Sequence, residues 1–296
     1  MLITALPGAK KENVQRVLRR AHIDLVNAVQ SRGDSFQRCV GYLRWAQEAH
    51  AALRGQISTA DMNRLIFTDR YWALQQAIMS ADAITGDLGV TLSGNVYLEM
   101  LEREVAFAGA VQALKQQVGR WSFGGCFVVA DTSFYIQHSK KLEEVDPGPL
   151  LDVVEGEQVH LLFPMAVIDE LDQLKESSKN HVRWRAGYTL SFIDRRFEAP
   201  AEIAVIRERS ALAKDSGGNP APVGKFTAEI LFDPPGHVRL PNADDEIIDR
   251  MVAIGPLVDG GVTLLTYDTG QSTRARAAGL NVVKLQHTLG QEPARS

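Results

Sequence analysis

Carboxylates follow two apolar runs in the C-terminal half of the chain. Residues 127–130 have no polar side chain and lead directly into Asp131, and residues 262–266 lead through Tyr267 into Asp268. Apolar runs of this length are typical of strands that are buried on both faces of a parallel sheet. The carboxyl ends of such strands open onto the crevice where α/β sheets bind ligands. We therefore expect Asp131 and Asp268 to lie at the same edge of one sheet.

Further acidic residues occupy equivalent places in the predicted topology. Glu170 lies in a predicted helix, 165–175, that follows an apolar strand at 159–163, and Asp244 and Asp245 open a predicted helix at 244–254. Strand–helix connections bring such positions to one edge of a sheet. A simpler explanation also exists for each, because Asp commonly caps helices and carboxylates in a first turn interact favourably with the helix dipole.

The predicted cluster consists of hard oxygen ligands without His or Cys, which selects Mg²⁺ or Mn²⁺. Such ions bind phosphates and activate water for in-line attack, so phosphodiester hydrolysis fits this group, whereas hydride and acyl transfer do not. The charge distribution agrees: residues 121–296 carry 18 Lys and Arg against 25 Asp and Glu. Clustered carboxylates repel one another, and a bound cation offsets that repulsion.

The order of predicted elements gives an α/β fold class preceded by an all-α domain. Alternating strands and helices over residues 124–287 predict a parallel sheet flanked by helices, with an antiparallel insertion at about 200–235. Residues 1–120 show helical periodicity at 9–32, 34–53, 61–79 and 95–120, which predicts an antiparallel bundle. The last of these helices is expected to bury Leu98, Leu101, Val105, Ala108 and Leu114.

Composition places the chain among ordinary globular proteins. Its 296 residues are 45% hydrophobic and carry a net charge of −4, which excludes a generally basic nucleic-acid coat. No apolar run approaches the roughly 20 residues that a membrane helix needs, and residues 1–11 become polar too soon for a secretory signal. Cys39 and Cys126 are far apart in sequence, so we expect free thiols in a reducing cytoplasm.

The acidic segments resemble the four acidic motifs of PIN-domain ribonucleases in order and approximate spacing, over roughly residues 124–287. The matching segments are Asp131-Thr132-Ser133, Val167 to Lys175, Asp244 to Ile248 and Leu264 to Asp268. The resemblance implies a Mg²⁺- or Mn²⁺-dependent endonuclease that acts mostly on single-stranded RNA. It implies that the metal-binding and catalytic carboxylates are Asp131, Glu170, Asp244, Asp245 and Asp268, with Asp244 and Asp245 as alternatives or partners. Thr132, Ser133 and Thr266 match small polar residues that support such a site.

Candidate phosphate contacts are the basic residues near these motifs, each of which could equally be an ordinary surface charge: Lys140, Lys141, Arg183, Arg185, Arg274 and Arg276. The resemblance further implies single-stranded RNA as a partner, and the lack of a long apolar run leads us to expect no membrane partner. Many small members are toxins with an antitoxin-like inhibitor, and dimers are common in the family. The role of the helical half is not indicated by its sequence.

Other classes of protein fit the sequence less well. An adhesion-type metal module needs Ser where Tyr135 stands, and a haloacid-dehalogenase-like phosphatase needs Asp where Ser133 stands. A flap-type DNA nuclease generally carries more acids and longer insertions. The alternative that stays open is a catalytically silent PIN fold that binds RNA or protein without cutting.

Overall fold

The structure is a computed structural model that describes residues 3–31, 33–80, 86–122, 124–153, 156–199, 202–208, 210–214, 220–234 and 237–286. The chain divides into two compact units, residues 1–122 and 123–296. Each unit has its own buried core and is described by itself.

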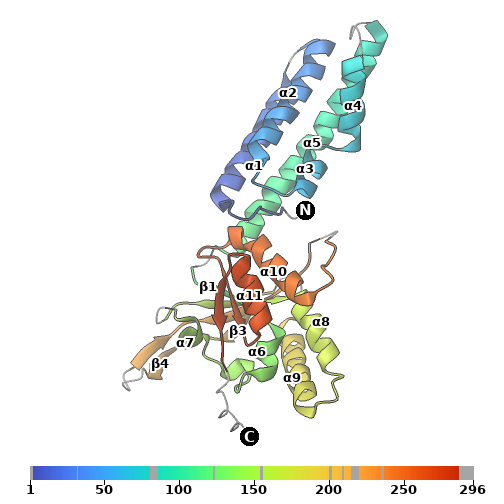
Figure 1. Cartoon of the computed structure of the whole chain (residues 1–296). Helices are drawn as coiled ribbons and strands as arrows, with labels where there is room; N and C mark the ends of the chain where they lie inside the picture. Colours follow the sequence, from blue (N-terminus) through green and yellow to red (C-terminus); the bar gives the residue numbers. More distant parts are fainter. Residues whose placement is uncertain are drawn as a thin grey trace. The chain divides into compact units, whose positions relative to one another are not determined.

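The N-terminal unit is helical, as predicted. Its elements are α1 (Lys11–Gln30), α2 (Ser35–Leu53), α3 (Thr59–Leu65), α4 (Asp69–Ser80) and α5 (Gly86–Arg120). Helices α1, α2 and α5 pack against one another, and α4 packs against α5 (Figure 1). Asp34 caps α2 through a reciprocal pair of hydrogen bonds with Gln37. Trp45 and Phe107 meet edge to face in the core, with ring centroids 5.5 Å apart.

The boundaries of two predicted helices were wrong. The predicted helix 61–79 is two helices, because the chain turns after Leu65 and α4 starts afresh with the Thr68 hydroxyl accepting the N–H of Tyr71. The predicted helix 95–120 begins earlier, at Gly86, so α5 includes Gly89 and Gly94. Glycine weakens a helix by only about 1 kcal/mol, and packing overrides that preference.

The predicted buried face of α5 was also partly wrong. Leu98 and Val105 are 55% and 74% exposed, whereas Met100, Phe107 and Leu114 are buried. The buried stripe contains Glu99, whose carboxylate pairs with Arg103 at 3.0 Å and accepts the Thr68 hydroxyl at 3.0 Å. Because a charged residue lies in the centre of the buried stripe, the stripe is not recognisable as apolar in the sequence. Helical periodicity therefore placed Leu98 and Val105 on the buried face, where they do not lie.

The C-terminal unit is built on a mostly parallel sheet, which confirms the predicted fold class. Within the described residues the sheet has six strands in the order β3-β6-β2-β1-β7-β8. They are β1 (Cys126–Ala130), β2 (Val159–Pro164), β3 (Ala204–Arg207), β6 (Phe226–Leu231), β7 (Val262–Thr266) and β8 (Asn281–Lys284). All described pairings are parallel except that between β3 and β6; a separate pair, β4 (Ser210–Lys214) with β5 (Pro220–Val223), is also antiparallel.

The prediction that residues 200–235 form an antiparallel insertion holds for β3 but is wrong for β6. Strand β6 pairs in parallel with the whole of β2 and is buried along almost its full length. Its Thr227 and Glu229 face His160 of β2, with Thr227 Oγ1 2.7 Å from His160 Nδ1 and a Glu229 oxygen 3.6 Å from His160 Nε2. This buried polar pairing makes the sequence alternate as if one face were exposed.

Helices flank the sheet and position the acidic residues. They are α6 (Thr132–Gln137), α7 (Pro147–Leu151), α8 (Met165–Leu174), α9 (Asn180–Arg196), α10 (Ala243–Ile254) and α11 (Thr269–Ala277), with short 3₁₀ turns at Leu142–Glu144 and Gly255–Leu257. Helix α9 packs against α6 and α8, and α11 lies against β7 and β8 (Figure 1). Among the described residues, no helix is both long and apolar enough to cross a membrane.

The revised face of α5 can be tested by two alanine substitutions. Phe107→Ala removes a fully buried ring and should lower the free energy of unfolding of the helical unit by about 3–5 kcal/mol. Val105→Ala removes an exposed side chain and should change it by no more than about 0.5 kcal/mol. Urea unfolding followed by tryptophan fluorescence measures both, and a larger loss in the Val105 variant would contradict this packing.

Candidate active site

Asp131 lies at the end of β1 and is held by donors from its own helix and from the neighbouring strand. Its Oδ1 accepts the Phe134 N–H at 3.1 Å and the Ser133 hydroxyl at 2.6 Å, so it caps α6. Its Oδ2 accepts the Thr266 hydroxyl at 2.5 Å. The side chain is only 4% exposed. Capping and a role in a site are therefore not alternatives here, because the cap fixes the carboxylate in place.

Asp268 is brought next to Asp131 by strand pairing. Strands β1 and β7 are parallel neighbours, with Ala130 opposite Leu265, and the Asp131 N–H donates to the Leu265 carbonyl at 3.1 Å. The Thr266 hydroxyl oxygen that donates to Asp131 also accepts the N–H of Asp268 at 2.8 Å. Asp268 in turn caps α11 by accepting the Gln271 N–H at 2.7 Å. One threonine thus connects both aspartates.

Ser133 and Thr132 link this pair to neighbouring elements. The Ser133 hydroxyl oxygen accepts the Tyr267 N–H at 2.9 Å, so α6 is tied to the turn after β7. The Thr132 hydroxyl donates to Glu170 Oε2 at 2.5 Å, which joins the first residue of α6 to the middle of α8. The structure therefore places Thr132, Ser133 and Thr266 beside the predicted acids, in hydrogen bonds with them or with their backbone.

Asp244 and Asp245 lie in the first turn of α10, after the N-cap Asn242. Both pair with Arg274 of α11: its Nη1 is 2.8 Å from Asp244 Oδ2, and its Nε is 3.3 Å from Asp245 Oδ1. The structure separates the two, because Asp244 also experiences the charges of Asp268 and Glu170. Asp244 is therefore the residue that faces the other predicted acids.

The four acids Asp131, Glu170, Asp244 and Asp268 form a closed ring of like charges. Burial is the largest cause that raises the pKa of Asp131, and the neighbouring Asp268 raises it further, against the lowering effect of the Ser133, Thr266 and Phe134 donors. The pKa of Glu170 is also raised, first by burial and then by Asp244 and Asp131, although the Thr132 hydroxyl lowers it.

The same applies to Asp244. Burial raises its pKa first, Asp268 and Asp245 raise it further, and Arg274 opposes them. Asp131, Glu170 and Asp244 therefore each lie near another carboxylate that raises their pKa.

The oxygen donors of the ring are of the kind that a hard divalent cation prefers, although no three of the ring carboxylates, all of them within the described residues, have ligand atoms within 4.8 Å of one another. The described residues contain one set of His, Cys, Asp or Glu side chains with three ligand atoms within 4.8 Å of one another, and it lies elsewhere, at Asp233, His237 and Glu246. The ring acids are more widely spaced. Mg²⁺ usually takes one or two carboxylates and retains several waters, so an all-protein cage is not required.

Comparison with protein families matches residues 128–286, more than half of the chain, to the PIN domain. This chain belongs to the PIN domain family. The match spans β1 to β8 and includes each of the ring acids, whereas the helical unit has no family match. A sequence search found no similar curated protein. PIN domains are commonly nucleases that use divalent metals, which agrees with the carboxylate composition of the ring.

The predicted phosphate contacts differ in their exposure and in the groups that they contact. Lys140, Arg183 and Arg276 are exposed, and Lys141 Nζ lies over the Tyr188 ring at 5.0 Å. Arg274 is directed at Asp244 and Asp245. The prediction for Arg185 was wrong: its guanidinium is buried and donates to the carbonyls of Tyr135 and Lys140 at 2.8 and 2.9 Å. It fixes α9 to α6 rather than facing a substrate.

Sequence reasoning missed Gln271. It is fully buried in α11, its backbone N–H donates to Asp268, and its side-chain amide donates to the Asp244 carbonyl at 3.3 Å. Gln271 therefore ties the start of α10 to the start of α11, between two acids of the ring. The Asp-x-x-Gln spacing from Asp268 to Gln271 resembles a helix N-cap and its N3 residue, and that signal was available in the sequence.

Charge crowding in the ring predicts that the stability difference between the wild type and Glu170→Gln depends on pH. The raised pKa of Glu170 means that its ionisation costs folding free energy, and this cost is absent below the ordinary carboxyl pKa and grows as pH rises through the raised value. Without divalent cations, Glu170→Gln should melt at nearly the wild-type temperature at pH 4 and a few degrees higher at pH 7, since about 1 kcal/mol shifts such a domain by about 2–4 °C.

Calorimetry across that pH range measures the difference, with Asp172→Asn as the control. Asp172 lies on the same helix but is half exposed and pairs with Lys175. A Glu170→Gln protein that melts below the wild type at pH 7 would contradict the crowding.

Proposed function

We propose that this chain is a Mg²⁺- or Mn²⁺-dependent endoribonuclease that hydrolyses phosphodiester bonds of single-stranded RNA. The observation that carries the proposal is the ring of mutually repelling carboxylates at the carboxyl ends of β1 and β7 in a PIN domain. Asp131, Asp268, Asp244 and Glu170 would hold the cation. When bound, it would supply charge to a phosphate oxygen and make water a better nucleophile at neutral pH.

The residues of the chain have separable roles in this proposal. Thr266 binds the Asp131 carboxylate and the Asp268 backbone N–H through its one hydroxyl group, and the Gln271 N–H orients the Asp268 carboxylate. Both principal ligands would therefore be held in place before a cation binds. Glu170 has a raised pKa and accepts the Thr132 hydroxyl through Oε2, so its carboxylate is suited to accept a proton from the attacking water. Arg274 pairs with both Asp244 and Asp245 and offsets one of their two negative charges in the absence of other cations.

An exposed aromatic and basic surface on α9 supports a single-stranded substrate. Trp184 is 54% exposed and stacks on Tyr188 at 5.4 Å between centroids, with Lys141 Nζ over both rings at 5.8 and 5.0 Å. Stacked rings beside a cation are the feature on which unpaired bases and their phosphates bind. Helix α9 packs against α6, which Asp131 caps, and against α8, which carries Glu170. The aromatic surface therefore lies on a helix that contacts both helices of the proposed site.

We also infer a cytoplasmic setting, because the chain has only two cysteines, Cys39 and Cys126, and proteins of oxidising compartments commonly carry more.

A second candidate function is a catalytically silent PIN domain that binds RNA or protein. The observation that favours it is Arg274, whose guanidinium provides the positive charge that a metal ion would otherwise bring to Asp244 and Asp245. In that case the acids would be a structural ion-pair network, and binding would not depend on divalent cations.

Cleavage of a labelled single-stranded RNA with Mn²⁺ distinguishes the candidates. Asp131→Asn should lower the rate by at least about a hundredfold, because even changes around metal ligands cost about 10–100-fold. Asp244→Asn should be similarly impaired and Asp245→Asn much less so, since Asp244 faces the ring. Asp172→Asn should cleave at the wild-type rate. Equal rates for wild type and a folded Asp131→Asn protein would favour the silent module.

Binding to the α9 surface can be measured separately from cleavage. In the Asp131→Asn background, Trp184→Ala should weaken binding to a short single-stranded RNA by about 1–3 kcal/mol, as expected for one lost stacking partner. Trp184→Phe keeps a ring and should lose less. Fluorescence anisotropy with RNA and DNA competitors of the same sequence also tests the RNA preference. An affinity that is unchanged in Trp184→Ala would remove this surface from the proposed substrate path.

A further inference from the structure

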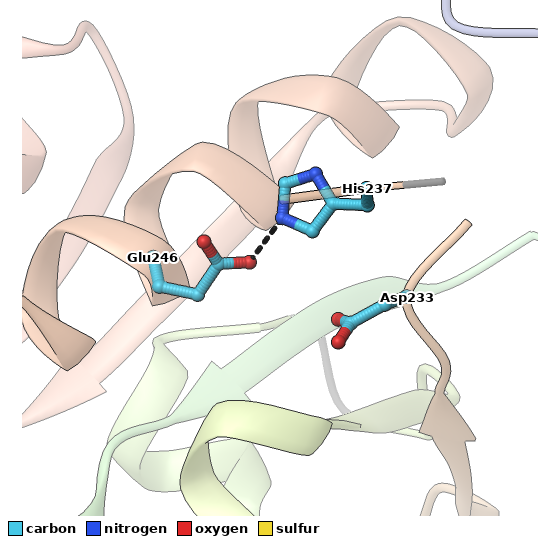
Figure 2. Close-up of side chains that lie close together, drawn as sticks. All are labelled: Asp233, His237 and Glu246. Atoms are coloured by element: carbon cyan, nitrogen blue, oxygen red, sulfur yellow. Dashed lines mark hydrogen bonds and ion pairs between the residues drawn. The ribbon is translucent and has the colours of Figure 1, made fainter. Parts of the chain in front are cut away.

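A second group of potential metal ligands lies in the segment between β6 and α10. Asp233 follows β6, His237 lies farther along the segment, and Glu246 is in the first turn of α10. One ligand atom from each lies within 4.8 Å of the others. Figure 2 shows His237 and Glu246 directed at each other and the carboxylate of Asp233 on the same side of α10. This group shares no residue with the carboxylate ring.

Glu246 is held as a ligand would be. The side chain is almost fully buried, and the residue is 1% exposed. Its Oε1 lies 2.7 Å from His237 Nε2, while its Oε2 accepts the Leu240 N–H at 2.9 Å. Protein ligands of metals are usually fixed in this way by hydrogen bonds to their other atoms. The orientation of Glu246 is therefore set by the backbone of the segment that it would help to bind.

Asp233 contributes the independent observation that points to a ligand. Its Oδ2 accepts the Arg239 Nε at 2.6 Å, but its Oδ1 is buried and has no hydrogen-bond partner among the residues that the structure describes. A buried carboxylate oxygen without a donor costs free energy, and a bound ion would satisfy it. The Asp233 side chain as a whole is 22% exposed.

The local charge also favours a cation. Arg239 pairs with Asp233 and Asp169, and Arg250 pairs with Asp249 and lies 3.4 Å from Glu246 Oε1. Among these described ion pairs, the carboxylates exceed the guanidinium groups by two when His237 is neutral. Arg250 retains Asp249 as a partner at 2.5 Å if Glu246 Oε1 turns to a metal.

We propose that Asp233, His237 and Glu246 bind a zinc-class transition-metal ion. Imidazole nitrogen and carboxylate oxygen are both zinc ligands, and three protein ligands leave the fourth position for water, whereas Mg²⁺ prefers oxygen alone. The ion ties the β6–α10 segment to α10 and thereby fixes the first turn that also carries Asp244. The site is independent of the proposed nuclease activity, and each can fail without the other.

Metal binding by the full-length, tag-free protein tests this inference. Zn²⁺ titrated by calorimetry should bind at one high-affinity site per chain, and Co²⁺ should give the visible absorption of a low-coordinate nitrogen–oxygen site that Zn²⁺ abolishes. His237→Gln removes a direct ligand and should weaken Zn²⁺ binding by at least about tenfold. His181→Gln, an exposed histidine on α9, is the matched control and should bind as the wild type does.

A second variant covers the case in which His237→Gln folds poorly. Asp233→Asn changes a partly exposed side chain, and Zn²⁺ should raise the melting temperature of the wild type but not of this variant. Asp131→Asn should retain the Zn²⁺-sensitive Co²⁺ spectrum, because the carboxylate ring is a different site. Absence of Zn²⁺ binding, or equal affinity in wild type and both His237→Gln and Asp233→Asn, would overturn the proposal and leave an ordinary His237–Glu246 hydrogen bond.

Discussion

The acids Asp131, Glu170, Asp244 and Asp268 repel one another, and the rest of the C-terminal unit must hold them together against that repulsion. Asp131 is buried and Glu170 and Asp244 are half-buried, and the pKa of each is raised first by burial and then by neighbouring carboxylates, so their proximity opposes folding. The structure keeps them together through hydrogen bonds from Thr132, Thr266 and the first turns of helices. The chain therefore spends folding free energy at this place, and proteins accept such a cost chiefly at functional sites.

Parallel strand order makes this arrangement possible. Because β1 and β7 are neighbours in the sheet, residues 131 and 268 are more than a hundred positions apart in sequence but share the Thr266 hydroxyl. Helix α10 adds Asp244 from the same turn that carries Glu246, so one short helix start contributes to the carboxylate ring and to the Asp233–His237–Glu246 group. Gln271 and Arg274 on α11 join that turn to the end of β7.

The sequence predicted the parts of the structure whose signals are local. The buried runs at β1, β2 and β7 are mostly apolar, with His160, Thr263 and Thr266 as the polar exceptions. Asp131 and Asp268 follow such runs, Asp244 lies in the first turn of a helix, and Glu170 lies within the helix that follows β2. The α/β fold and the positions of the acids follow from that pattern. The polar supports at Thr132, Ser133 and Thr266 lie directly beside the acids in sequence, which is why they too were identifiable.

The sequence failed where polar groups are buried in pairs. Glu229 with His160 made a core strand resemble an edge strand, and Glu99 with Arg103 concealed the buried side of α5. Arg185 was predicted to meet phosphate because its burial against backbone carbonyls has no local signal. The grouping of Asp233, His237 and Glu246 depends on how the segment before α10 folds back, and no spacing rule reveals that.

The central claim is that the ring acids converge on one hard cation. Anomalous diffraction from a crystal soaked in Mn²⁺ measures this directly. The account predicts a peak within coordination distance, about 2.0–2.3 Å, of oxygens from both Asp131 and Asp268, with Asp244 or Glu170 bound directly or through water. Full Mn²⁺ occupancy elsewhere in the crystal, with no peak between Asp131 and Asp268, would contradict it.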